Sequence, residues 1–124
     1  MKLPSSVVEL AKLAASKVSM KQRHGAVVFK RGVILGSGYN FYAAPPSTCN
    51  KKSLSIHAER DALSGLRHDQ LHGASILVIR LRPNGELSWG GPCVGCKKLL
   101  ARKGLDKCFY YNELGMLCCC YLQS

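Results

Sequence analysis

The amino-acid sequence predicts a single α/β domain, a three-layer α-β-α sandwich with a mixed central sheet. Its length of 124 residues fits one compact domain, and a hydrophobic fraction of 47% is enough for a sizeable core. Segments with helical spacing of apolar residues also alternate with β-rich segments along the chain. We therefore expect one domain over residues 1–124, with its core at about 5–112 and a short cysteine-rich tail at 113–124.

In the N-terminal half, apolar residues recur at helical spacing and predict a helix over about 5–20. Ser6-Val7-Val8-Glu9 has the form of a capping box at its start. Two β-rich runs, 25–30 and 33–39, are separated by the turn residues Arg31-Gly32, which predicts a hairpin. Proline, serine and asparagine residues between 43 and 53 predict a loop.

The C-terminal half continues the alternation of helices and strands. We expect a helix at about 56–67, a strand at 74–81, a turn at 83–85, a helix from near Cys93 to Gly104, and a strand at 107–111. The last helix should connect its two flanking strands as a right-handed parallel crossover.

The formal net charge of +11 is large for this length. The eighteen Lys and Arg residues are spread along the chain, which is typical of a solvated surface. The same charge would also suit a polyanionic partner, such as a nucleotide phosphate, RNA or DNA. Charge alone does not distinguish a single phosphate from a polymer.

Cysteine usage indicates a reducing compartment. The seven cysteines are an odd number and three of them are consecutive, unlike a secreted disulfide framework. The N-terminus has no uninterrupted apolar run typical of a secretory signal, and we expect no membrane span. We therefore expect an intracellular protein of the cytoplasm or nucleus.

Three residues have the composition of an open zinc site. His57, Cys93 and Cys96 supply one imidazole and two thiolates, which leaves the fourth tetrahedral position for water. Cys93 and Cys96 are one turn apart at a predicted helix start, where the helix dipole favours thiolates. We expect one Zn²⁺ per chain.

Glu59 follows His57 by two positions and is the expected catalytic residue. Near a helix start, its carboxylate can reach the water on the metal without binding the metal itself. It would then move protons between that water and the substrate.

A closed structural site is the non-enzymatic alternative. The chain would then be a basic, zinc-stabilised nucleic-acid-binding module with a fourth protein ligand, such as Cys49 or Cys108. A redox role for the Cys-x-x-Cys pair is a further alternative.

The His57-Ala58-Glu59 and Pro92-Cys93-Val94-Gly95-Cys96 motifs resemble the zinc-dependent cytidine and deoxycytidylate deaminase superfamily. The resemblance covers roughly residues 5–112 and implies a cytidine deaminase-like fold. It implies hydrolytic deamination of cytosine to uracil in a nucleotide or in single-stranded DNA or RNA. An adenosine-to-inosine deaminase acting on tRNA, or another purine or pterin deaminase, is the enzymatic alternative.

The resemblance also implies substrate contacts. Asn40, in the Gly38-Tyr39-Asn40 turn, would contact the base or sugar, and the Ala58 backbone amide would contact the base. Trp89, close to Pro92, would stack on a base or else cap the core. His24 and Lys51 are candidates for contacts with sugar or phosphate. Because small deaminases of this type commonly associate, we expect a homodimer or larger assembly.

Overall fold

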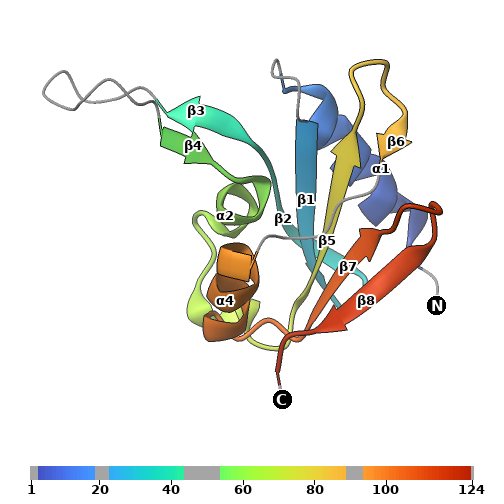
Figure 1. Ribbon diagram of the computed structural model, residues 1–124. Coiled ribbons are helices and arrows are strands. Elements are labelled where there is room, and N and C mark those ends of the chain that lie inside the picture. The colour runs from blue at the N-terminus through green and yellow to red at the C-terminus, as the bar shows by residue number, and fades with distance from the viewer. Residues whose placement is uncertain (1–2, 19–22, 44–53, 89–93, 124) are drawn as a thin grey trace, which may run out of the picture.

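The computed structural model describes residues 3–18, 23–43, 54–88 and 94–123 (Figure 1). Helices and strands alternate along much of the chain. In order, the elements are α1 (Ser5–Ser16), β1 (Arg23–Lys30), β2 (Val33–Tyr39), β3 (Phe41–Ala43), β4 (Leu54–Ile56), α2 (Ala58–Leu63), α3 (His68–Leu71), β5 (Ser75–Leu81), β6 (Leu87–Ser88), α4 (Val94–Arg102), β7 (Lys107–Tyr111) and β8 (Leu117–Tyr121).

The main sheet is mixed, as predicted. Its strand order is β2-β1-β5-β7-β8, and the short β6 pairs with β5. β1 is antiparallel to both β2 and β5, and β7 is antiparallel to β8. β5 and β7 are parallel and are connected through α4, which confirms the expected parallel pairing. β3 and β4 form a separate antiparallel ribbon.

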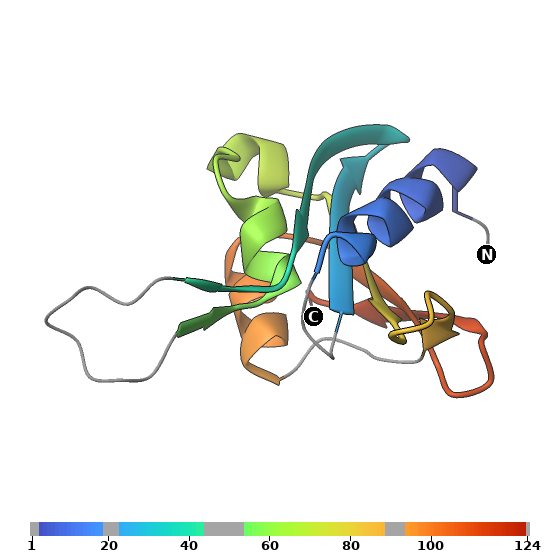
Figure 2. The same ribbon diagram turned by 90° about the horizontal axis from the view of Figure 1, so that it is seen from above.

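Helices cover both faces of this sheet, which gives the predicted layers. Figure 2 shows α1 on one side and α2 with α4 on the other. Alternate residues of the central strands face opposite sides, because side chains alternate along a strand. In β1, Val27 packs in a cluster with Val7 and Ala11 of α1. Val28, the next residue, packs in a second cluster with Ala62 of α2 and Leu100 of α4. We call this second side the α2/α4 face.

Glycines in β2 allow α2 to approach the sheet closely. A Cβ atom at Gly36 would lie 2.8 Å from the carbonyl oxygen of Ala62, and one at Gly38 would collide with the backbone of Asp61 and Ala62. The absence of a side chain therefore sets the depth at which α2 packs. The position of α2 matters for the candidate site, because His57 and Glu59 lie at the start of this helix.

The first helix differs from the prediction at both ends. It begins at Ser5 after Pro4, whose carbonyl oxygen accepts a hydrogen bond from the Val7 N–H at 3.1 Å. Ser6 therefore lies inside the first turn, and the expected capping box is wrong. The helix ends at Ser16 rather than near residue 20.

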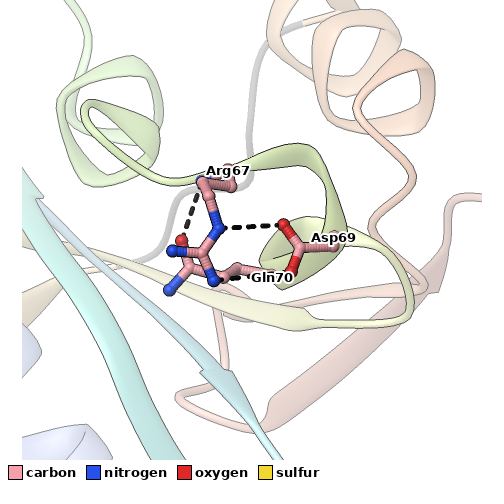
Figure 3. A network of polar contacts seen from close by, with 3 residues as sticks. All are labelled: Arg67, Asp69 and Gln70. Atoms are coloured by element: carbon pink, nitrogen blue, oxygen red, sulfur yellow. Dashed lines mark hydrogen bonds and ion pairs between the residues drawn. The ribbon is translucent and has the colours of Figure 1, made fainter.

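The helix predicted at 56–67 is also shorter. His57 has an extended backbone and precedes α2, while Ser64 leaves the helical region and Gly65 has a φ of +81°. The next helix, α3, follows Arg67, whose backbone N–H donates to Oε1 of Gln70 at 2.8 Å. The Arg67 guanidinium also contacts Asp69 at 3.1 Å, and Figure 3 shows this exposed network.

The cysteine-rich segment that was expected to be a tail contains a strand of the main sheet. Leu117–Tyr121 form β8, which pairs along its whole length with β7 at the edge of the sheet. The three cysteines of this strand are half-buried. Within the described residues, no helix has the length and apolar character that a membrane crossing requires.

Candidate metal centre and active site

The candidate site lies where α2 and α4 begin. His57 immediately precedes α2, Glu59 is its second residue, and Cys96 is the third residue of α4. Both helices lie on the same face of the sheet, so their first turns come together (Figures 1 and 2). Packing of Ala58, Ala62 and Leu100 against the same sheet residues keeps the two helices adjacent.

Three potential ligand groups converge at this point. The nearest ligand atoms of His57, Glu59 and Cys96 all lie within 4.8 Å of one another. Nδ1 of His57 is 3.2 Å from Sγ of Cys96. Glu59 and Cys96 are only 3% and 2% exposed, whereas His57 is exposed. The cluster therefore presents an accessible imidazole above a buried carboxyl group and a buried thiol.

The imidazole and the thiol suit zinc. Two such ligands on one tetrahedral zinc ion would place the nitrogen and sulfur atoms about 3.6 Å apart, given the usual zinc–ligand bond lengths. The observed separation of 3.2 Å requires only a small adjustment. Among the described residues, no other group of three such side chains comes together, and Cys108 does not belong to this one.

His24 lies at the edge of the same site. Burial lowers the pKa of its imidazole, the Glu59 carboxylate raises it, and the charges of Arg80 and His57 lower it further. The net effect favours the neutral ring. The backbone of His24 is bonded to Asn40, and the preceding residue, Tyr39, is bonded to Asp61 of α2, which brings His24 to the end of the sheet beside that helix.

Asn40 connects the ends of the first two strands beside the site. Its Oδ1 accepts a hydrogen bond from the His24 N–H at 2.7 Å, and its backbone N–H donates to the His24 carbonyl oxygen. The side chain is 9% exposed. Asn40 therefore fixes the backbone of His24 and itself lies in a defined orientation.

Most of the described candidate residues come together. His57, Ala58, Glu59 and Cys96 form the centre, and His24 and Asn40 adjoin it through β1 and β2. Cys93, Trp89, Lys51 and Cys49 lie outside the described residues, so their predicted roles stay predictions.

Two residues at the site were not predicted from the motifs. Asp61 accepts a hydrogen bond from the Tyr39 N–H through Oδ2 at 3.0 Å, which ties α2 to the end of β2. Arg80 pairs with His24 across β1 and β5. The alternation of residues in the predicted strand 74–81 could have placed Arg80 on one face, but it could not show what lies opposite.

Comparison with known proteins supports this picture at the level of sequence and fold. A deoxycytidylate deaminase from Mycobacterium phage D29 is 28% identical over 113 residues, which cover 75% of this chain and 80% of the phage protein. No family model matches the chain.

Solved structures of deaminases share the architecture. Cytidine deaminase from Burkholderia pseudomallei superposes with a TM-score of 0.66 at 22% identity, covering 98% of this chain and 94% of that one. The dCMP deaminase of cyanophage S-TIM5 superposes with a TM-score of 0.60 at 23% identity, covering 87% and 81%. The chain has the cytidine deaminase-like fold that the motifs predicted.

Proposed function

We propose that this protein is a zinc-dependent hydrolytic deaminase that converts cytosine to uracil in a nucleotide or in single-stranded nucleic acid. One observation carries the proposal: the buried carboxyl group of Glu59 lies within 4.8 Å of two zinc-type donor groups, from His57 and Cys96. The deoxycytidylate deaminase of phage D29, which aligns with most of the chain, supports the choice of reaction and base.

His57, Cys96 and Cys93 would hold the metal, with Cys93 assigned from its motif. Bound zinc supplies a Lewis acid that lowers the pKa of a water molecule towards 7. The start of α4 favours the thiolate form of Cys96, because unpaired backbone N–H groups point out of a helix N-terminus. Cys108, a candidate fourth ligand of a closed structural site, does not join this cluster, which argues against that residue as a ligand.

Glu59 would transfer protons in the reaction. Its carboxylate takes a proton from the attacking water, whose oxygen bonds to C4 of the cytosine ring. It delivers that proton to the ring nitrogen N3. It then moves the proton of the new C4 hydroxyl group to the amine, so that the C4–N bond breaks, the C4=O bond forms and ammonia leaves. Because the side chain is almost fully buried, few water molecules compete with the substrate for this carboxylate.

Asn40 and the Ala58 backbone amide would orient the substrate. Ala58 is the first residue of α2, so its N–H lies at the helix start beside Glu59. Asn40 is already held by the backbone of His24. We propose that these two groups contact the base or sugar.

The test is a substrate panel with the full-length, zinc-loaded chain. Deoxycytidine, dCMP, single-stranded DNA, RNA and a tRNA anticodon stem are assayed for ammonia release and base conversion. We expect uracil to form from at least one cytosine substrate. Conversion of adenine instead of cytosine would overturn the assignment of the base, and no conversion of any substrate would overturn the proposed activity.

Glu59→Gln provides the mechanistic test, because it keeps the size of the side chain and removes its ability to carry a proton. We expect turnover to fall by about 10²- to 10⁴-fold, while zinc content stays unchanged. Glu113→Gln, an exposed site in the turn before β8, removes the same charge and should leave turnover unchanged. Normal turnover by Glu59→Gln would contradict the mechanism.

A further inference from the structure

Arg80 lies on the face of the sheet that carries the site. In β5, Ile76 and Val78 point to the α2/α4 face, where they pack with Ala58 and Ala62. Two residues further along the strand, Arg80 continues the same row, because alternate side chains share a face. In β1, Val28 and Ala26 face the same helices, and His24 continues that row.

The two rows end side by side. β1 and β5 are antiparallel, and the register pairs His24 directly with Arg80. On the other side of Arg80, its partner in β6 is Ser88, so the strand is held between neighbours up to this residue. Arg80 is half-buried and is therefore fixed next to His24. The backbone of His24 is bonded to Asn40, and the residue before Asn40, Tyr39, is bonded to Asp61 of α2, the helix that carries Glu59.

Arg80 has no acidic side chain as an ion-pair partner in the part of the chain that the structure describes. All seven Asp and Glu side chains belong to the described part of the chain, and within that part no carboxylate forms an ion pair with Arg80. A half-buried guanidinium without a carboxylate partner is a suitable binding group for a planar or tetrahedral oxyanion.

We propose that Arg80, assisted by His24, forms a subsite for a phosphate group of the substrate. This inference rests on the proposed deaminase function and deepens it, because it assigns the residue that recognises the phosphate of the proposed substrate. The phosphate can belong to a mononucleotide or to a polynucleotide backbone, since the guanidinium recognises the same oxyanion in both.

The test compares substrates with and without phosphate. In the zinc-loaded protein, Arg80→Gln should lower kcat/KM for dCMP by about 10- to 100-fold, mainly through KM, because hydrogen bonds to charged groups have this strength. The value for deoxycytidine should stay unchanged. Arg80→Lys should restore part of the loss, because it returns the charge without the planar fork.

Lys30→Gln is the matched control. Lys30 lies at the opposite end of β1 and is also half-buried, so this variant removes one positive charge from the sheet away from the site. It should leave both substrates unaffected. A single-stranded oligonucleotide with one internal cytosine distinguishes the two sources of phosphate. If Arg80→Gln lowers kcat/KM for dCMP alone, the subsite binds the phosphate of a mononucleotide. If it lowers kcat/KM for dCMP and for the oligonucleotide, the subsite also binds a backbone phosphate.

Equal losses for deoxycytidine and dCMP in Arg80→Gln, or no loss with dCMP, would overturn the inference. Calorimetric binding of dUMP and deoxyuridine separates this outcome from failure of the proposed function, because binding does not require turnover. If Arg80→Gln fails to fold, Arg80→Lys and wild type are compared by the same binding measurement. Weaker dUMP binding with unchanged deoxyuridine binding supports the subsite, and unchanged dUMP binding contradicts it.

Discussion

Nδ1 of His57 and Sγ of Cys96 lie 3.2 Å apart, although 39 positions separate them in the sequence. The two residues belong to the starts of different helices, and these helices pack on the same face of one sheet. A metal ion bound by both side chains would cross-link α2 to α4. Metal content and stability should therefore change together.

Removing either ligand should release zinc. We expect about one zinc ion per chain in the wild type and a large loss in His57→Ala and Cys96→Ser, measured by metal analysis after dialysis. Zinc should raise the Tm of the wild type and not that of the variants. Cys118→Ser, on the half-buried edge strand β8, is the control and should keep its zinc. Full zinc content in Cys96→Ser would show that this thiol is not a ligand.

The close packing of α2 on β2 should make Gly38 intolerant of a side chain. In Gly38→Ala the new methyl group would collide with the backbone of Asp61 and Ala62, which cannot move without shifting the helix. We expect the free energy of unfolding to fall by about 1–3 kcal/mol in denaturant titrations. Gly95→Ala in α4 has no heavy atom within 4 Å of the added Cβ, so it should not destabilise the fold. Equal stability of the two variants would argue against this packing.

Two variants of Asn40 can separate its structural role from its proposed role in substrate binding. Asn40→Asp keeps an oxygen that can accept the His24 N–H, whereas Asn40→Ala loses it. We expect Asn40→Ala to lower the free energy of unfolding by about 1–3 kcal/mol, because a part-buried N–H loses its acceptor. Asn40→Asp should fold as stably as the wild type and lose activity through the carboxamide N–H donors that it lacks. A fully active Asn40→Asp would mean that Asn40 only holds the backbone of His24 and does not contact the substrate through its carboxamide N–H groups.

Burial should protect Cys108 from alkylation. Burial, with a smaller contribution from the Glu59 charge, raises the pKa of its thiol to about 12, so the reactive thiolate is scarce at pH 8 and at pH 9. Peptide mapping after iodoacetamide treatment should show little label at Cys108 in the folded protein and full label in guanidinium chloride. The half-buried cysteines 118–120 provide the comparison and should gain label without denaturant. Rapid labelling of native Cys108 would contradict its burial.

The sequence predicts the central strands best. The run at 107–111 coincides with β7, and the runs at 25–30, 33–39 and 74–81 fall on β1, β2 and β5, because these strands are rich in β-branched and aromatic residues. The ribbon of β3 and β4 was not predicted, since each strand has only three residues and the turn-forming composition of residues 43–53 predicts only a loop. β8 was missed because Leu117–Tyr121 does not alternate in polarity, and its pairing with β7 determines its conformation.

The residues of the site also differ in how well the sequence alone identifies them. His57, Glu59 and Cys96 are recognisable because the motifs keep chemically specific residues close together in sequence. Arg80 has no such signal. Its position depends on which residue of β1 lies opposite, and that register is fixed only when the two strands pair.

The pairing of β1 with β5 also determines when the site can exist. The hairpin of β1 and β2 and the crossover from β5 through α4 to β7 each involve nearby residues, and they can form early in folding. β1 and β5, by contrast, must meet across the intervening residues 31–74. We therefore expect His57 to reach Cys96 only after that closure, and an ion held by both to bind the native chain more tightly than its partly folded precursors. Metal uptake during refolding would then report the final assembly step.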